Sequence, residues 1–375
     1  MTIGYNAIEV EVDLEAIRHN YRILKEKGSN VYGVVKADAY GHGLVEVSRA
    51  LEAEGADTFA VGTVGEALSL RNSGCSKRII ALLGPLSETD CFNAAKYDII
   101  PFVGEFEQLE MLSKVVASQG RKVRICLKFD TGMSRLGFSL DELEQLVSWL
   151  KGNPDVIPVL ASSHLATSDD PAYEEYMNGQ AGKFTHILDT LSAAGFELEA
   201  SLANSAGILV HDRVHFSAQR GGIALYGANP LNGTRWEGLG ERLRPAMQVS
   251  TRIAAVRRLT KGQAVSYGCT YVAERDMTVA IVCAGYADGY SRQLSNTGEV
   301  CIKGKRAPIL GRVCMQLCIV DVSHVEGVNF ADRAYLLGGE GEGRISPDDL
   351  AGWWGTITYE VFCLLGLNPR VYRNK

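Results

Sequence analysis

The sequence lacks the features that would place it in a membrane, in the secretory pathway or on a nucleic acid. None of its apolar stretches, such as Met277–Ala284, approaches the length needed to span a bilayer. Basic residues are in deficit, with 38 Lys+Arg against 44 Asp+Glu, so we expect no face that neutralises nucleic-acid phosphates. The first residues carry an acid early and no basic flank before an apolar core, so we expect no signal peptide.

The cysteines do not form a recognisable framework. The 9 cysteines are odd in number and scattered, and no two have the C-x-x-C spacing typical of structural zinc sites or redox motifs. A chain of this length does not need disulfides for stability, so we interpret them as reduced thiols and expect a cytoplasmic protein. We expect no metal site.

The chain does have enough apolar residues for a large core, at 46% hydrophobic and 22% charged. In its first part, short runs of nearly continuous hydrophobicity alternate with helical patterns such as Leu44–Ala53, Phe106–Ala117 and Ala181–Ala194, which indicates buried parallel strands. The runs are Val31–Lys36, Thr58–Gly62, Ile79–Leu83, Ile99–Val103, Val123–Phe129, Ile157–Ser163, Leu198–Leu202 and Ile223–Tyr226. The sequence therefore predicts an α/β fold with an N-terminal (β/α)8 TIM barrel.

The pattern changes after about Gly240, where strand-like runs follow one another with few helices between them. A segment rich in turn-forming residues, Asn229–Glu241, precedes this change. We therefore predict a barrel domain over residues 1–241 and a C-terminal mainly-β domain over residues 242–375.

Polar residues occur at the predicted carboxyl ends of the barrel strands, where the active sites of TIM barrels lie. They are Lys36, Lys128, His164, Asn204 and Ser205, while Arg220, Gly221 and Gly222 lead into the predicted eighth strand. Taken alone, a lysine after a strand is usually a solvated strand end. Lys36 differs because it closes an apolar run, and a lysine held in an apolar pocket loses its proton easily and can form a Schiff base.

The loops after the seventh and eighth strands are the usual phosphate site of a TIM barrel. In this sequence they offer the hydroxyl of Ser205 and the backbone N–H groups of Gly222 and Ile223. A Schiff-base lysine and a phosphate site at one barrel mouth together indicate pyridoxal 5'-phosphate as the cofactor.

Ten short motifs then follow one another along the chain: VVKADAYGHG, LKFDTGMSRLG, SSHLAT, ANSAG, RGGIALYG, LRPAMQVSTRI, VSYGCTY, GYADGYSR, GRVCM and TITYEVFC. With them the sequence resembles the bacterial alanine racemases over essentially its whole length. Each motif is modestly specific, but ten in the same order are highly specific. The resemblance implies a pyridoxal-phosphate barrel followed by a β domain, acting as a head-to-tail homodimer on a small amino acid.

The resemblance also implies the two catalytic residues. Racemisation removes a proton from one side of a carbon and returns one to the other, so two groups must flank that carbon. Lys36 resembles the lysine that forms the Schiff base and then acts as the base on one face. Tyr267, in VSYG, resembles the base for the opposite face, which in this family comes from the partner subunit.

The remaining site residues are likewise implied by the resemblance. Those expected around the cofactor are Tyr40, His164, Asn204, Ser205, Arg220, Gly222, Ile223 and Tyr359. Arg220 resembles the partner of the pyridine nitrogen, where a permanent cation weakens the electron sink. Arg135 and Met315 resemble the groups that bind the substrate carboxylate, and Lys128 resembles a lysine that is carbamylated in many relatives.

Two tyrosines of the GYADGY motif, Tyr286 and Tyr290, resemble residues near the entrance of the site. The sequence departs from the usual family pattern at Gly221, where proline is more frequent, and at Gln316-Leu317, where relatives usually have Asp-Gln. Gln316 replaces a carboxylate close to the substrate carboxylate site with a neutral amide.

Several activities fit this scaffold. We expect interconversion of L- and D-alanine, which would supply peptidoglycan synthesis. The Gln316 departure leaves a serine/alanine racemase of the vancomycin-resistance type, making D-serine, as an alternative, although Tyr359 favours alanine. A basic amino-acid decarboxylase would lack the VSYG tyrosine, and a non-catalytic pyridoxal-phosphate carrier would generally lack the β domain.

Overall fold

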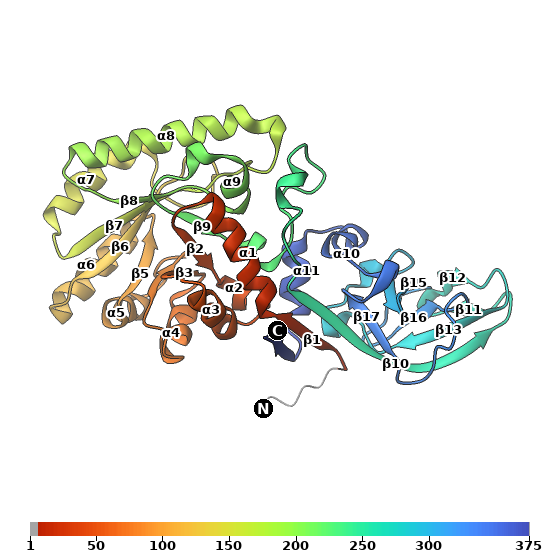
Figure 1. The fold of residues 1–375 in the computed structure, drawn as a ribbon. Helices are drawn as coiled ribbons and strands as arrows, with labels where there is room; N and C mark the ends of the chain where they lie inside the picture. The colour runs from red at the N-terminus through yellow and green to blue at the C-terminus, as the bar shows by residue number, and fades with distance from the viewer. Residues whose placement is uncertain (1–6, 375) are drawn as a thin grey trace. The chain divides into compact units, whose positions relative to one another are not determined.

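The structure, a computed structural model, describes residues 7–374 and divides the chain into two compact units (Figure 1). One unit contains residues 17–39 and 44–244. The other contains the described residues up to Ala16, the short segment Tyr40–Gly43, and the residues from Pro245 onward. None of the helices within residues 7–374 is long and apolar enough to cross a membrane.

The larger unit is a barrel of eight parallel strands in the order β8-β7-β6-β5-β4-β3-β2-β9. The strands are β2 (Val31–Val34), β3 (Thr58–Val61), β4 (Arg78–Ala81), β5 (Ile99–Val103), β6 (Val123–Lys128), β7 (Val156–Ser162), β8 (Glu199–Ser201) and β9 (Gln219–Gly221). A parallel bridge between Ser201 and Ala218 brings the two ends of this sheet together. The expected TIM barrel, followed by a mainly-β domain, is confirmed.

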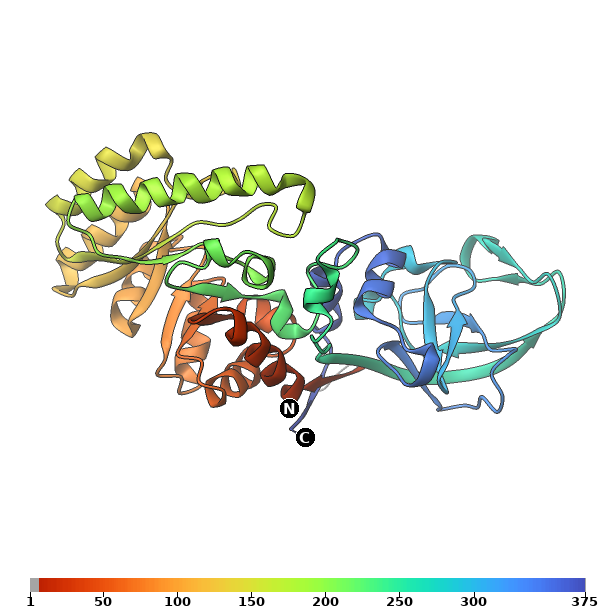
Figure 2. The same cartoon turned by 45° about the horizontal axis from the view of Figure 1, so that its top comes forward.

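Helices cover the outside of the barrel strands (Figure 1, Figure 2). They are α1 (Leu14–Lys27), α3 (Leu44–Ala53), α4 (Val64–Asn72), α5 (Glu88–Tyr97), α6 (Phe106–Gln119), α7 (Leu143–Gly152), α8 (Glu174–Ala193) and α9 (Ser205–Val210). In α6, Leu109, Leu112 and Val116 are buried at helical spacing, and burying each such side chain contributes about 1.5–3 kcal/mol. The sequence therefore specifies these helices through one apolar face each.

The predicted eighth strand is wrong. Ile223–Tyr226 forms a 3-10 helix, and the strand that completes the barrel is β9, Gln219–Gly221. All three β9 residues are buried although two are polar, because Arg220 finds hydrogen-bond acceptors inside the barrel. An apolar run was therefore the wrong signal at this point of the chain.

The second unit is built around a sheet with the order β15-β14-β17-β10-β1-β18, to which β13 and β16 add through β10. Its strands are β1 (Glu9–Asp13), β10 (Met247–Leu259), β13 (Met277–Val282), β14 (Glu299–Ile302), β15 (Lys305–Pro308), β16 (Cys318–Asp321), β17 (Arg333–Leu337) and β18 (Arg370–Arg373). A short hairpin of β11 (Ala264–Val265) and β12 (Tyr271–Val272), and the helices α10 (Pro347–Trp354) and α11 (Thr358–Leu365), complete the unit. The long strand β10 pairs with β1 and β17 along its first part and with β13 along its second.

Candidate active site

Lys36 lies two residues after the end of β2 and begins a left-handed turn, α2 (Lys36–Tyr40). Ala37, Asp38 and Ala39 have φ of 53–54° and ψ of 47–51°. Consecutive left-handed residues cost roughly 1–2 kcal/mol each, so the surroundings must hold them in place. The Asp38 carboxylate accepts the N–H of Leu44 at 2.7 Å, and Ala39 donates its N–H to the carbonyl of Val35 at 2.9 Å.

A glutamate from the next barrel segment also supports this turn. Glu66, in the first turn of α4, accepts the N–H groups of Gly62 at 2.6 Å and Thr63 at 3.1 Å with one carboxylate oxygen. Its other oxygen accepts the N–H of Asp38 at 3.3 Å. The half-buried Lys36 side chain therefore starts from a backbone that two neighbouring barrel segments fix at the end of β2.

Arg220, on β9, is 6% exposed and is the most heavily bonded residue of this end of the barrel. Its guanidinium donates to the hydroxyls of Ser162 at 2.9 Å and Ser201 at 2.6 Å. It also donates to the carbonyls of Ser163 at 2.6 Å and Leu202 at 3.2 Å. Burial lowers the pKa of Arg220 to about 10, so it remains a cation at neutral pH. Its Nε–H has no acceptor among the described residues and is available to a ligand.

His164 lies beside this cation. Its Nδ1 is 3.2 Å from Nη2 of Arg220, and because a guanidinium can only donate, Nδ1 must be the acceptor. Burial, and then the charges of Arg220, Arg135, Lys128 and Lys36, hold the pKa of His164 well below its ordinary value. The ring is therefore neutral and carries its proton on Nε2.

Ser205 and Asn204 shape the loop that follows β8. The buried Ser205 hydroxyl oxygen accepts N–H groups from Gly222 at 2.9 Å and Ala224 at 3.3 Å, which leaves its proton free to be donated. Asn204 caps α9 by accepting the N–H of Gly207 at 3.0 Å. The N–H of Ile223, the first of its 3-10 helix, has no acceptor within that helix. These groups form a set of donors suited to an anion.

Lys128 ends β6 and is 8% exposed, with its amine 2.7 Å from the carbonyl of Phe129. Burial, and then the nearby Arg220 charge, lowers the pKa of Lys128 to about 8. A substantial fraction of this amine is therefore neutral near physiological pH.

Asp130 organises the turn between Lys128 and Arg135. Burial acts against its ionisation, but backbone N–H groups outweigh burial and hold the pKa of this carboxyl below its usual value. The Asp130 carboxylate accepts the N–H groups of Gly132 and Met133, each at 2.8 Å, with one oxygen, and that of Arg135 at 3.1 Å with the other. The backbone of Arg135 is thus anchored, while its side chain is exposed.

The other expected residues lie in the second unit. The rings of Tyr40 and Tyr359 are 6.0 Å apart. Burial raises the pKa of Tyr40 above its ordinary value, so its phenol stays protonated and can donate. Tyr267 and Met315 are 71% and 58% exposed and line a cavity of about 520 Å³. The other residues lining this cavity are Ala7, Cys283, Asp288, Cys314, Gln316 and Leu317.

The two tyrosines expected near an entrance differ in the structure. Tyr286 is 46% exposed, whereas Tyr290 is fully buried inside its unit. The burial of Tyr290 means that its side chain contacts its own unit and not solvent, and its place near an entrance stays a prediction. In the barrel, the charges of Lys36, Lys128, Arg135 and Arg220 all act on His164, and those of Arg135 and Arg220 also act on Lys128.

Comparison with known proteins identifies the family. The alanine racemase N-terminal domain matches residues 12–230, and the alanine racemase C-terminal domain matches residues 246–374. An alanine racemase of Nitratidesulfovibrio vulgaris (strain DSM 19637 / Miyazaki F) is 52% identical over 373 residues, covering 100% of both chains. The chain belongs to the alanine racemase family. An alanine racemase of Lawsonia intracellularis is 40% identical, with 96% of each chain covered.

Solved alanine racemases have the same fold. The alanine racemase of Streptomyces lavendulae matches with a TM-score of 0.91 and 34% identity, over 99% of this chain and 98% of that one. The alanine racemase of Bartonella henselae, a structure with covalently bound pyridoxal phosphate, matches with a TM-score of 0.88 and 29% identity, over 98% and 99% of the two chains. The sequence-based assignment to the alanine racemase family is confirmed.

The barrel residues of this alanine racemase family member fit the cofactor that the family implies. The free donors of Ser205 and Ile223 suit a phosphate, and the unused Nε–H of Arg220 suits an unprotonated ring nitrogen. No carboxylate among the described residues bonds the Arg220 guanidinium, so its charge is available to an anionic ligand.

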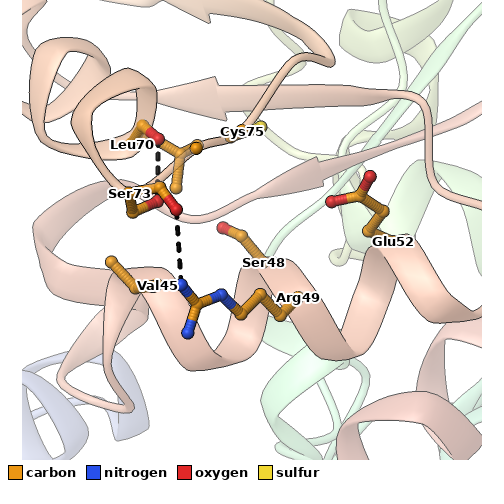
Figure 3. A pocket seen from close by; sticks show the side chains of 8 residues that line it. Val45, Ser48, Arg49, Glu52, Leu70, Ser73 and Cys75 are labelled. Atoms are coloured by element: carbon orange, nitrogen blue, oxygen red, sulfur yellow. Dashed lines mark hydrogen bonds between the residues drawn. The ribbon is translucent and has the colours of Figure 1, made fainter.

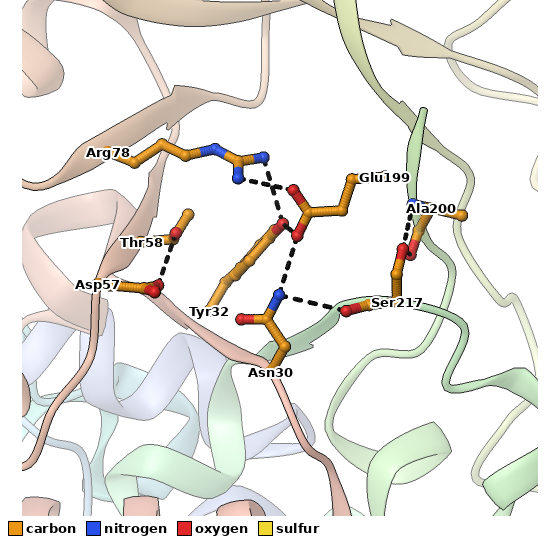
Figure 4. Close-up of polar contacts among 8 residues, drawn as sticks. All are labelled: Asn30, Tyr32, Asp57, Thr58, Arg78, Glu199, Ala200 and Ser217. Atoms are coloured by element: carbon orange, nitrogen blue, oxygen red, sulfur yellow. Dashed lines mark hydrogen bonds and ion pairs between the residues drawn. The ribbon is translucent and has the colours of Figure 1, made fainter. Parts of the chain in front are cut away.

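The opposite end of the same barrel is occupied by a polar network (Figure 4). Glu199, at the start of β8, pairs with Arg78, at the start of β4, at 2.6 Å, and accepts the phenol of Tyr32 and the amide of Asn30. Because these residues lie at the amino ends of their strands, they fill the face of the barrel that supports stability in this fold. Burial, and then the Glu199 bond, raises the pKa of Tyr32.

A separate small cavity of about 60 Å³ lies between α3 and α4 (Figure 3). Arg49 donates to the carbonyl of Ser73 at 3.3 Å at this place, and the buried Ser48 hydroxyl has no partner among the described residues. The cavity has room for water but not for a substrate.

The sequence reading missed the residues that hold the site together. Ser162, Ser163 and Ser201 supply acceptors to Arg220, and Asp130 anchors the backbone of Arg135. One signal was available: serines at the ends of otherwise apolar strands are buried polar groups that require a partner.

Proposed function

We propose that this chain is an alanine racemase that interconverts L- and D-alanine with pyridoxal 5'-phosphate. One observation carries the proposal: in a barrel of the alanine racemase family, Lys36 lies on a fixed turn beside a neutral His164 and a cationic Arg220. The relatives reported above are alanine racemases and give no support to a serine-directed enzyme.

The cofactor would be attached through Lys36. Its phosphate would be held by the donors of Ser205, Gly222, Ile223, Tyr40 and Tyr359, with Asn204 stabilising the loop. Its ring would lie against His164 and Arg220. When bound, pyridoxal phosphate supplies the electron sink that stabilises negative charge at the substrate Cα.

The chain's own groups would move the protons. The Lys36 amine would take or return a proton on one face of the Cα, and the Tyr267 phenol on the other. Arg135 and the backbone N–H of Met315 would hold the substrate carboxylate, which keeps the Cα between the two bases. Each direction of the reaction uses the same pair with their roles exchanged.

We propose that the site is completed by a second copy of the chain in a head-to-tail dimer. Support comes from the second unit, where Tyr267, Tyr286, Met315 and Leu317 are 71%, 46%, 58% and 42% exposed. Apolar side chains with this exposure are typical of a surface that another protein covers. The C-terminal domain of one subunit would supply Tyr267 to the barrel of its partner.

Lys128 would carry a carbamate. The neutral amine nitrogen attacks the carbon of CO2, a nitrogen–carbon bond forms, and a proton leaves to solvent, which gives an anion. The lowered pKa of Lys128, about 8, supports this step because only the neutral amine is nucleophilic. The new anion would orient the Arg135 guanidinium.

We place the enzyme in the cytoplasm, supplying D-alanine for peptidoglycan. The support is that all nine cysteines lie in the described region as free thiols. Reduced thiols are typical of a cytoplasmic protein.

The test is kcat/KM for L-alanine and L-serine, measured side by side on cofactor-loaded enzyme. We expect a strong preference for alanine, although a hydrophobic pocket alone rejects an added hydroxyl poorly. Comparable values would instead establish a serine/alanine racemase. Release of CO2 from a basic amino acid, without racemisation, would establish the decarboxylase.

A further inference from the structure

The backbone that carries Tyr267 is strained at the preceding residue. Ser266 has φ of 62° and ψ of -174°, a conformation that glycine adopts readily and other residues do not. Such a residue costs of the order of 1–3 kcal/mol and persists only where its surroundings fix it. The contacts that hold the Ser266 backbone in this conformation are made by its side chain. The Ser266 hydroxyl donates to the carbonyl of Arg312 at 2.6 Å and lies 3.4 Å from Sγ of Cys314.

The segment that Ser266 contacts leads directly to Met315. Gly311, at the start of this segment, lies very close to the loop that carries Ser266 and Tyr267. A Cβ on Gly311 would lie 2.6 Å from the carbonyl oxygen of Val265. On its other side, Tyr286 donates its N–H to the carbonyl of Cys314 at 3.2 Å, and Ala287 donates to that of Met315 at 2.9 Å. The Met315 segment is therefore firmly held, and Ser266 links the Tyr267 loop to it.

The Tyr267 side chain has little else to hold it. It is 71% exposed, and its phenol makes no hydrogen bond to any residue within 7–374. The position of its oxygen therefore depends on the backbone of the loop, which runs through the left-handed residues Gly268 and Cys269 immediately afterwards.

We propose that Ser266 is a positioning residue, whose hydroxyl ties the loop carrying Tyr267 to the segment carrying Met315 and so fixes the phenol relative to the substrate carboxylate. This inference rests on the proposed role of Tyr267 as one of two bases. Without the hydroxyl, the strained backbone relaxes and the phenol moves. A displacement of about 1 Å at a reacting group can cost on the order of 100-fold in rate.

The test uses the Ser266→Ala holoenzyme in D2O, with racemisation and Cα–H exchange followed by NMR for each alanine enantiomer separately. We expect racemisation to fall about 10- to 100-fold. Lys36 remains intact, so the enantiomer whose Cα–H faces Lys36 should still exchange its proton without inverting. The other enantiomer should lose exchange and racemisation together.

The matched control is Ser323→Ala, in the same unit. Its hydroxyl accepts the N–H of Thr278 at 2.9 Å, and Ser323 is not among the residues lining the cavity. This variant should show wild-type exchange and racemisation. A second readout needs no activity: amide hydrogen exchange of the segments 264–272 and 311–317 should accelerate in Ser266→Ala and not in Ser323→Ala.

Tyr267→Phe separates failure of this inference from failure of the proposed function. Tyr267→Phe should also exchange the Cα–H of only one enantiomer, with a larger loss of racemisation than Ser266→Ala. If Tyr267→Phe racemises alanine at the wild-type rate, the two-base function itself is wrong. If Tyr267→Phe is one-sided but Ser266→Ala behaves as wild type, the positioning role alone is overturned. A Ser266→Ala variant that loses exchange of both enantiomers equally would also overturn it, because that pattern indicates general damage.

Discussion

At the level of single residues, the carboxyl end of the barrel concentrates positive charge. Arg220 bonds only neutral acceptors, serine hydroxyls, carbonyls and an imidazole nitrogen, among the described residues. Its charge contributes to lowering the pKa values of Lys128 and His164. An anionic ligand would therefore find its counter-charges already in place, without reorganisation of the site.

The lowered pKa of Lys128 makes stability depend on pH. Between the folded-state pKa of about 8 and the ordinary pKa of 10.5, the Lys128 amine holds its proton in the unfolded chain and loses it in the folded chain. The unfolded state binds more protons there, so in CO2-free buffer the free energy of unfolding should rise with pH across this interval, by roughly 3 kcal/mol. Urea unfolding at a series of pH values, compared with Lys128→Met, measures the difference.

Bicarbonate provides the control for this experiment. A carbamylated lysine holds no amine proton in the folded state, whereas the unfolded amine still binds one below pH 10.5. With bicarbonate, the difference between wild type and Lys128→Met should therefore keep rising with pH below pH 8 as well, where the CO2-free curve is flat. Parallel wild-type and variant curves in CO2-free buffer would contradict the lowered pKa.

Residue identity alone does not determine exposure, as the GYADGY motif illustrates. Tyr286 and Tyr290 are the same residue type in one motif, yet one is 46% exposed and the other fully buried. Burial is decided by the surrounding elements, which the sequence does not place. Lys36 and Arg220 were predictable because each charged residue adjoins an apolar or glycine-rich run, where a charge requires a partner or a function.

At the level of elements, we expect the same alanine-to-glycine substitution to stabilise the protein in the left-handed turn after β2 and to destabilise it in a right-handed helix. Ala37 is exposed with φ of 53°, so Ala37→Gly should remove strain and raise the free energy of unfolding by up to about 1 kcal/mol. The same substitution in the right-handed helix α8, Ala181→Gly, should lower it by about 1 kcal/mol. Calorimetry on both variants measures the two shifts. Destabilisation by Ala37→Gly would show that its Cβ contributes more than the strain costs.

The barrel strands show which elements the hydrophobicity pattern of the sequence can predict and which it cannot. Buried parallel strands such as Ile99–Val103 read as continuous apolar runs, and the prediction agrees with β5 at both ends. β9 could not be found this way, because its buried polar residues depend on acceptors from β7 and β8. The left-handed turn at Ala37–Ala39 was equally invisible, since alanine gives no local signal for that conformation.

At the level of the whole molecule, a shared active site predicts complementation between inactive chains. Lys36→Ala and Tyr267→Phe should each be nearly inactive as homodimers. After mixing and subunit exchange, a mixed dimer has one site with both bases intact, so activity should recover to about one quarter of wild type. Racemisation assays before and after mixing measure this. No recovery, with labelled wild-type chains shown to exchange under the same treatment, would place both bases in one chain.

The position of β1 has a consequence for dissecting the protein. β1 lies between β10, to which it is antiparallel, and β18, to which it is parallel. A fragment starting at Pro245 would therefore have two open sheet edges where β1 belongs, and unpaired edges of this kind recruit other chains and aggregate. During synthesis, β1 must also wait for strands from the far end of the chain, a pairing of high contact order that is expected to form slowly. The mainly-β unit is thus inseparable from the strand that precedes the barrel.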